Sequence, residues 1–181
     1  MIYLRVIVLA IGLMTAISAI SAEFDWNQYK PTTIQGLIKS LDESTKDIGP
    51  NRRVYVGVLR YKAIVQFTGK FRDIPKQHAE FIEELPKVYK FVPPEITNLY
   101  SKELLLQEGE LQIWAPVQDV LVKPLQDELR IGDSFEIYFY YLGTIFADHI
   151  FGINEFQKRT SPNTALNRTP VRDVALRNGL G

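Results

Sequence analysis

Cysteine is absent from this 181-residue chain, and histidine occurs only twice. Without thiols the fold cannot contain a disulfide, and neither a thiol-linked lipid nor a cysteine-containing zinc site can form. Stability must therefore come from the burial of apolar side chains, which make up 46% of the residues. With so few nitrogen and sulfur ligands, we expect no metal site.

An excess of one charge and glycine-rich motifs are missing as well. The chain has 21 basic and 21 acidic residues, so bulk attraction to nucleic acid is not expected. Its eleven glycines are dispersed, and none belongs to a Gly-x-Gly-x-x-Gly, Walker or Gly-x-Ser-x-Gly sequence. We therefore expect no nucleic-acid partner, no cofactor and no serine nucleophile of the hydrolase type.

The longest apolar run lies at the N-terminus and resembles a secretory signal. Arg5 supplies a positive charge, residues 6–20 are almost entirely apolar, and Ser21 and Ala22 offer small residues for cleavage. The pattern predicts a cleavable signal peptide at 1–22 and export to the periplasm or the extracellular space. The alternative is an uncleaved N-terminus that makes the protein a membrane-anchored accessory domain. About 15 apolar residues are short for a bilayer span, which favours the signal peptide.

The remainder of the chain divides by composition into two parts. Residues 23–157 are rich in aliphatic and aromatic side chains and predict a single globular domain that is soluble after cleavage, without stable membrane insertion. Residues 158–181 are rich in Lys, Arg, Ser, Pro, Asn and Thr, and this composition predicts a disordered tail.

Two segments carry the three- and four-residue apolar spacing of amphipathic helices. The first spans 33–47, and Thr32 with Gln35 resembles a capping box at its start. The second follows Pro75 and is interrupted by Pro86, which predicts a kink or a restart. Shorter helices are expected at 94–100 and, more ambiguously, at 117–129.

Alternating patterns predict five or six strands. Residues 53–72 alternate with period two and predict either two strands or one strand bent near Gly57. Residues 104–107 and 111–114 resemble a hairpin. The strongest pattern lies at 135–141 and is followed by a second strand at 145–156.

These elements predict an α+β fold. We expect a small, strongly curved antiparallel sheet or a partly open β-barrel of about five or six strands. An N-terminal amphipathic helix precedes it, and a kinked helix is inserted between strands. Over 53–157 the arrangement resembles an oligonucleotide/oligosaccharide-binding (OB-like) or SH3-like barrel in architecture, with no residue motif of either family.

The best candidate binding residues are Lys62, Lys70 and Arg72. Alternation along the strand places them on one face together with Gln66 and Thr68, where they could meet an anionic polymer. Basic residues on an exposed strand also protect it from aggregation, which is the simpler interpretation.

The histidines offer the only acid–base candidates. His78 begins an apolar helix face and is interpreted as a partly buried helix residue. His149 is a weak catalytic candidate, because its strand neighbour Asp148 points to the opposite face and cannot easily pair with it. A carboxylate such as Asp148 or Glu155 could approach His149 only through folding.

Three hypotheses follow for function. The first is an exported, non-catalytic binding or envelope-assembly module whose partner is an envelope polysaccharide or an envelope protein. The second is a small secreted hydrolase that uses His149 with a nearby carboxylate. The third is an accessory domain anchored at the membrane by its N-terminus. The sequence predicts neither the ligand nor the oligomeric state.

Overall fold

The computed structural model describes residues 24–47 and 53–159, so the expected signal peptide at 1–22 lies outside the described residues, as does the expected tail beyond 159. The elements in chain order are η1 (Trp26–Gln28), β1 (Lys30–Pro31), α1 (Ile34–Thr45), β2 (Arg53–Asp73), α2 (Lys76–Val88), η2 (Pro94–Asn98), β3 (Lys102–Glu108), β4 (Leu111–Val117), α3 (Asp119–Glu128), β5 (Ser134–Ile145) and β6 (Asp148–Lys158).

Five strands close into a barrel in the order β2-β3-β4-β6-β5, and β5 pairs again with β2. Strand β2 makes this closure possible through its length. From Arg53 to Gln66 it pairs with β5, and from Gln66 to Asp73 it pairs with β3. One long strand therefore joins the two edges of the sheet, and β1 adds a short parallel pairing beside it.

The barrel is mixed, because β4 and β6 run parallel at Val117 and Ile153 while the other barrel pairs are antiparallel. Helix α3 and strand β5 lie between these two strands in the sequence. The predicted α+β class and curved barrel are confirmed, but the sheet is closed and mixed rather than antiparallel and partly open. The OB-like or SH3-like likeness stays a prediction.

Strand β2 is one strand with two irregularities. Its register with β5 shifts between Tyr55 and Leu59, which agrees with the predicted bend near Gly57. Its register with β3 shifts between Phe67 and Phe71, where Gly69 adopts a positive φ of 71°. Bulges of this kind increase local twist, which a long strand needs in order to curve around a small barrel.

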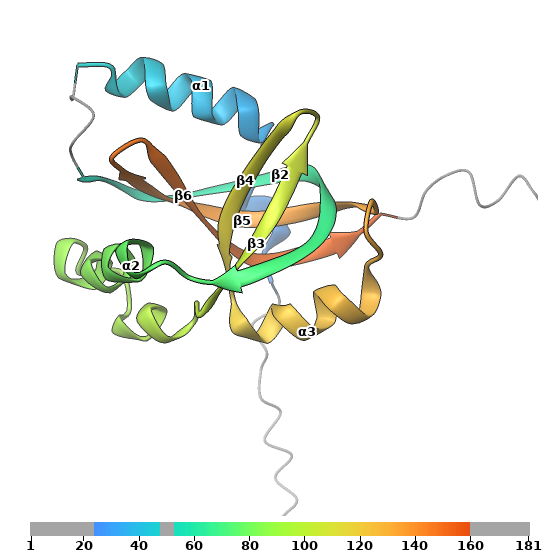
Figure 1. Ribbon diagram of the computed structural model, residues 1–181. Coiled ribbons are helices and arrows are strands. Elements are labelled where there is room, and N and C mark those ends of the chain that lie inside the picture. Colours follow the sequence, from blue (N-terminus) through green and yellow to red (C-terminus); the bar gives the residue numbers. More distant parts are fainter. Residues whose placement is uncertain (1–23, 48–52, 160–181) are drawn as a thin grey trace, which may run out of the picture.

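The barrel interior is filled by the inward-facing side chains of all five strands together with residues of α1 and α3. Alternating residues of β5 are completely buried, as the sequence pattern predicted: Phe135, Ile137, Phe139 and Tyr141. A second hydrophobic cluster joins α2 and η2 to the outer side of β5 and β6. Figure 1 shows α1 and α3 on opposite sides of the barrel.

Helix α1 begins one residue later than the predicted capping box implies. Its N-cap is Thr33, whose hydroxyl accepts from the Gly36 amide at 3.1 Å, so the pairing of Thr32 with Gln35 is wrong. The carboxylate that completes the cap comes instead from Glu108 in the β3–β4 hairpin, whose two oxygens accept from the first amides of the helix at 2.9 and 2.8 Å. A distant acid thus accepts from the first two amides of the helix, whereas the expected local glutamine would accept from the N-cap amide.

Helix α2 lies between β2 and β3, as expected for the inserted helix. It continues through Pro86 to Val88 and does not restart there. Both predicted short helices exist, as η2 and α3. No helix within the described ranges is long and apolar enough to cross a bilayer.

The β5–β6 hairpin turns later than the sequence suggested. Strand β5 continues through Ile145, and Phe146 and Ala147 form the turn, with Phe146 at a positive φ of 56°. A left-handed conformation is unusual for an aromatic residue, so the pattern gave no signal for it. Figure 1 shows this turn projecting between α1 and α2, which brings the first residues of β6 to both helices.

Candidate functional site

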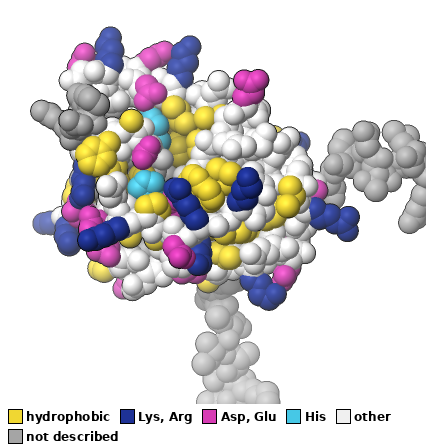
Figure 2. Space-filling view, in the orientation of Figure 1, with side chains coloured by type: hydrophobic (Ala, Val, Ile, Leu, Met, Phe, Trp, Pro, Cys, Tyr) yellow, Lys and Arg dark blue, Asp and Glu magenta, His cyan; other side chains and the backbone are white. Residues whose placement is uncertain are grey.

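A pocket of about 340 Å³ opens where α1 and α2 meet the ends of β2, β4 and β6. Both histidines of the chain line it, and we call it the histidine pocket. Its other principal residues are Asp42, Arg72, Trp114 and Asp148. Figure 2 shows the two histidines in cyan close together on this face, with acidic side chains beside them.

Beneath the pocket, the carboxylate of Glu103 is completely buried and joins three elements. One oxygen lies 2.6 Å from Nδ1 of His78 on α2. The other accepts from Nε of Arg72 on β2 at 2.7 Å and lies 2.6 Å from Nη2 of the same side chain. A buried charge is tolerated only when it is paired and hydrogen-bonded, and Glu103 satisfies both conditions.

The Arg72 guanidinium also covers an aromatic ring. Its central carbon lies 4.2 Å from the centroid of the Trp114 ring, which is the geometry of a cation–π contact. Arg72 on β2 lies opposite Glu103 on β3, and Trp114 on β4 lies opposite Leu105, two residues further along β3, so the register brings the three side chains to one face of the sheet.

The geometry fixes the protonation pattern of a neutral His78. A carboxylate only accepts, so Nδ1 of His78 carries the hydrogen that Glu103 receives, and the free lone pair is on Nε2. The nearest acid to Nε2 is Asp148, whose oxygen lies 3.9 Å away, beyond hydrogen-bond distance. In its neutral form, His78 therefore presents to the pocket an oriented acceptor that has no hydrogen-bond partner among the described residues.

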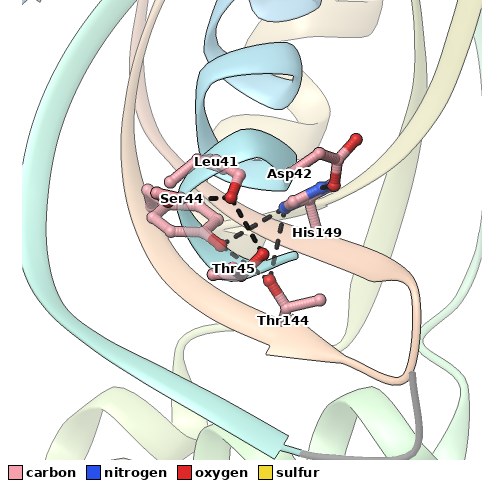
Figure 3. Close-up of polar contacts among 7 residues, drawn as sticks. Leu41, Asp42, Ser44, Thr45, Thr144 and His149 are labelled. Atoms are coloured by element: carbon pink, nitrogen blue, oxygen red, sulfur yellow. Dashed lines mark hydrogen bonds and ion pairs between the residues drawn. The ribbon is translucent and has the colours of Figure 1, made fainter. Parts of the chain in front are cut away.

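His149 differs because both of its ring nitrogens are engaged. Its Nε2 lies 3.0 Å from Asp42 of α1, and its Nδ1 lies 3.2 Å from the Tyr141 hydroxyl and 3.3 Å from that of Thr144 (Figure 3). The two hydroxyls are 2.7 Å apart. A neutral ring that donates to Asp42 and accepts from one hydroxyl satisfies every group, so His149 fastens α1 to the barrel.

Burial raises the pKa of Tyr141 above its ordinary value, and the hydrogen bond with Thr144 opposes part of that rise. The hydroxyl therefore stays protonated across the physiological range and remains able to donate.

The turn at Phe146 and Ala147 places the adjacent residues Asp148 and His149 at the start of β6, where they contact different helices. Successive side chains of a strand point in opposite directions, so Asp148 faces α2 while His149 faces α1. The predicted divergence of Asp148 from His149 agrees with this placement. Neither Asp148 nor Glu155 pairs with His149 among the described residues, because Asp42 occupies that position.

The predicted basic set of β2 is distributed over three surroundings. Lys62 lies 3.8 Å from Glu136 and 5.7 Å from the Tyr138 ring centroid, whereas Lys70 is exposed beside a different hollow. Arg72 belongs to the histidine pocket. The structure therefore places one of the three at that site and keeps the other two apart from it.

When the histidines are neutral, the charged groups in the lining besides Arg72 are the carboxylates of Asp42 and Asp148, and the other side-chain donors are Gln112 and the Trp114 indole. Asp42 and Asp148 have side chains that are 65% and 75% exposed, and the positive charge of Arg72 is already paired with Glu103. The pocket thus favours a ligand that donates hydrogen bonds and carries positive charge. No group of three or more His, Cys, Asp or Glu side chains able to hold a metal occurs among the described residues.

Sequence reasoning missed Glu103 and Asp42. Glu103 immediately precedes the apolar run of β3 and carries no motif, and only its register opposite Arg72 explains it. Asp42 is one of two adjacent acids on α1, and its partner lies 107 residues away. Neither relationship has a local signal.

Comparison with known proteins does not indicate a function, so the function is inferred from the geometry of the pocket. No protein-family model matches the chain, and no curated protein matches its sequence.

Proposed function

We propose that the protein is an exported, non-catalytic binding module and that the histidine pocket is its ligand site. The observation that carries the proposal is the ring of His78, which Glu103 holds through Nδ1 while Nε2 faces the pocket with no hydrogen-bond partner among the described residues. A ligand that donates to Nε2 meets a ring that Glu103 has already oriented, so little side-chain order is lost on binding. The OB-like or SH3-like architecture expected from the sequence is compatible with such a role.

The ligand class follows from charge. Asp42 and Asp148 stand exposed at the pocket, and the lone pair of His78 lies beside Asp148. An ammonium or guanidinium group can donate to both carboxylates and to the imidazole nitrogen. We therefore expect a basic side chain of a partner protein, and of the two partner classes expected from the sequence this favours an envelope protein over a polysaccharide.

The direct test is an NMR titration of the purified protein with Nα-acetyl-lysine methylamide, whose side-chain amine is free. We expect shifts of the amides around 146–149. Acetylation of the probe's side-chain amine removes its charge and should weaken binding by about tenfold or more. Equal binding of the charged and acetylated probes overturns the proposal.

Asp148→Asn is the matched variant, because this side chain is exposed and its loss leaves the core intact. We expect about a tenfold loss of affinity, whereas Asp127→Asn on α3, across the barrel, should have no effect. Unchanged binding by Asp148→Asn places the ligand elsewhere.

The basic face of β2 gives a distinguishable alternative. If an acidic polysaccharide such as polygalacturonate binds, if Lys62→Glu and Lys70→Glu abolish that binding, and if Asp148→Asn has no effect, the module binds anionic polymer along the strand instead. The three surroundings of Lys62, Lys70 and Arg72 favour the pocket over this version.

A hydrolase is the second candidate, and the geometry moves its base from His149 to His78. A buried acid that orients Nδ1 and leaves Nε2 open is the arrangement of a general base. Hydrolysis of p-nitrophenyl acetate by the purified protein, lost in His78→Gln and retained in His149→Gln, would support an enzyme. Activity equal to that of free imidazole removes it.

Export itself is tested separately. Intact mass measurement of protein from the native compartment distinguishes cleavage after Ser21 or Ala22 from an uncleaved, membrane-anchored N-terminus.

A further inference from the structure

A second pocket, of about 330 Å³, lies between the segment that follows α2 and the outer face of β2 and β5. Apolar side chains form most of its wall, among them Phe91, Ile96 and Leu99. We call it the Arg60 pocket after the one charged residue in its lining. None of its lining residues belongs to the histidine pocket, so it is a separate site.

The rim of this pocket exposes large apolar surface. Phe91 is 68% exposed and Leu99 is 37% exposed, while Ile96 beside them is buried in the second hydrophobic cluster. Apolar side chains that line a concavity favour the entry of an apolar group that covers them.

Arg60 gives the pocket its charge preference. Its guanidinium carbon lies 5.8 Å from the centroid of the Tyr140 ring, on the neighbouring strand. The other two arginines of β2 have carboxylate partners, Glu80 and Glu84 for Arg53 and Glu103 for Arg72. Among the described residues, no acid forms an ion pair with Arg60, which leaves its bidentate donor group open to a ligand carboxylate.

The floor holds a further polar group without a partner. The Tyr100 hydroxyl is buried and forms no hydrogen bond of normal geometry, although the nearby Gln118 amide partly opposes the rise that burial causes in the pKa of Tyr100. The hydroxyl lies so close to Gly152 that a Cβ there would approach its oxygen to 2.9 Å. Glycine at 152 therefore makes room for this tyrosine below the pocket.

We propose that the Arg60 pocket binds a small monocarboxylic acid with an aromatic or short aliphatic body. The carboxylate pairs with Arg60 at the rim, and the apolar body lies against Phe91, Ile96 and Leu99. The volume is at the lower end of the range for ligand pockets, which limits the occupant to about one ring or a short chain.

The test is an NMR titration of the protein with 3-phenylpropanoate, with 3-phenylpropanamide and acetate as probes that lack the charge and the apolar body. We expect 3-phenylpropanoate to shift amides of residues 91–100, and each control probe to bind about tenfold more weakly or not at all. Shifts confined to the histidine pocket, or none up to about 10 mM, overturn the proposal.

Two variants separate the charge from the apolar wall. Arg60→Gln should reduce affinity for 3-phenylpropanoate to that for the amide, and Leu99→Trp should fill the pocket and abolish binding of both. Arg130→Gln, an exposed arginine before β5, is the control and should bind as the unaltered protein does. Equal affinity of Arg60→Gln and the unaltered protein for the acid contradicts the proposal. The outcome does not depend on whether the histidine pocket binds a basic group, because 3-phenylpropanoate carries a negative charge.

Discussion

Glu103 and His78 are 25 residues apart in the chain, and their side chains meet at 2.6 Å in the interior. Because the second Glu103 oxygen binds Arg72, the same carboxylate ties α2 to both β2 and β3. The histidine pocket therefore rests on a buried ionic group that must stay intact for the wall to hold its shape.

Glu103→Gln should destabilise the protein strongly. The neutral amide leaves Arg72 without its counter-charge, but the Arg72 side chain is 40% exposed and water can solvate part of it, so we expect a cost of about 2 kcal/mol in the free energy of unfolding. Urea denaturation measures this. Glu43→Gln, on the exposed part of α1, is the control and should change stability by less than about 0.5 kcal/mol. A loss below about 1 kcal/mol for Glu103→Gln would show that the ion pair contributes little.

Removing the long-range cap of α1 should destabilise that helix. Glu108→Ala removes the acceptor for two amides at the helix start, and we expect a cost of about 1 kcal/mol. Hydrogen exchange at Ile34 and Gln35 should accelerate. Glu110→Ala, in the same hairpin but exposed, should leave both quantities unchanged; similar effects of the two variants would contradict the cap.

Gly143 is required by close approach as well as by backbone conformation. Its φ is 144°, and an added Cβ would lie 2.2 Å from the carbonyl oxygen of Val54 on β2. Gly143→Ala should therefore cost more than about 3 kcal/mol or prevent folding. Gly109→Ala, with positive φ but open space around it, should cost about 1 kcal/mol. Urea denaturation measures both losses. Equal unfolding midpoints for the two variants would mean that β2 shifts to make room for the new methyl group at little cost.

Alkaline titration should reveal the buried tyrosines. Burial raises the pKa of Tyr29, Tyr100, Tyr138 and Tyr141 in the folded state. A group whose pKa is higher when folded contributes stability that is complete below its unfolded pKa of about 10 and is lost progressively above that pH. Absorbance at the tyrosinate band should therefore rise in two phases, with the second coinciding with unfolding by circular dichroism. A single titration phase near pH 10 with the fold intact would show that these four tyrosine hydroxyls are not buried.

Much of the barrel could be predicted from the sequence, because its inward residues obey a local rule. Ala63, Val65 and Phe67 alternate on one face, and all three are buried as the period-two pattern requires. The pattern cannot tell which strand lies beside which. The parallel contact of Val117 with Ile153 depends on how α3 returns the chain, and no property of either residue encodes it.

The candidate site was less predictable for the same reason. Lys62, Lys70 and Arg72 were grouped by alternation alone, whereas the surroundings that distinguish them come from β3, β5 and α2. His149 was a catalytic candidate in the sequence because histidine is rare in this chain. In the structure, both of its ring nitrogens lie within hydrogen-bond distance of other side chains. The more open ring belongs to His78, whose orientation depends on an acid that no motif marks.

The cap that Glu108 supplies to α1 also bears on the order of folding. The Glu108 carboxylate lies more than 70 positions further along the chain than the helix start, so this part of the α1 cap forms only once the β3–β4 hairpin exists. The barrel seam between β2 and β5 is similarly non-local. Such topology has high contact order and favours slow, late consolidation. The start of α1 is therefore expected to reach its full stability late in folding, although it is synthesised before the hairpin that caps it.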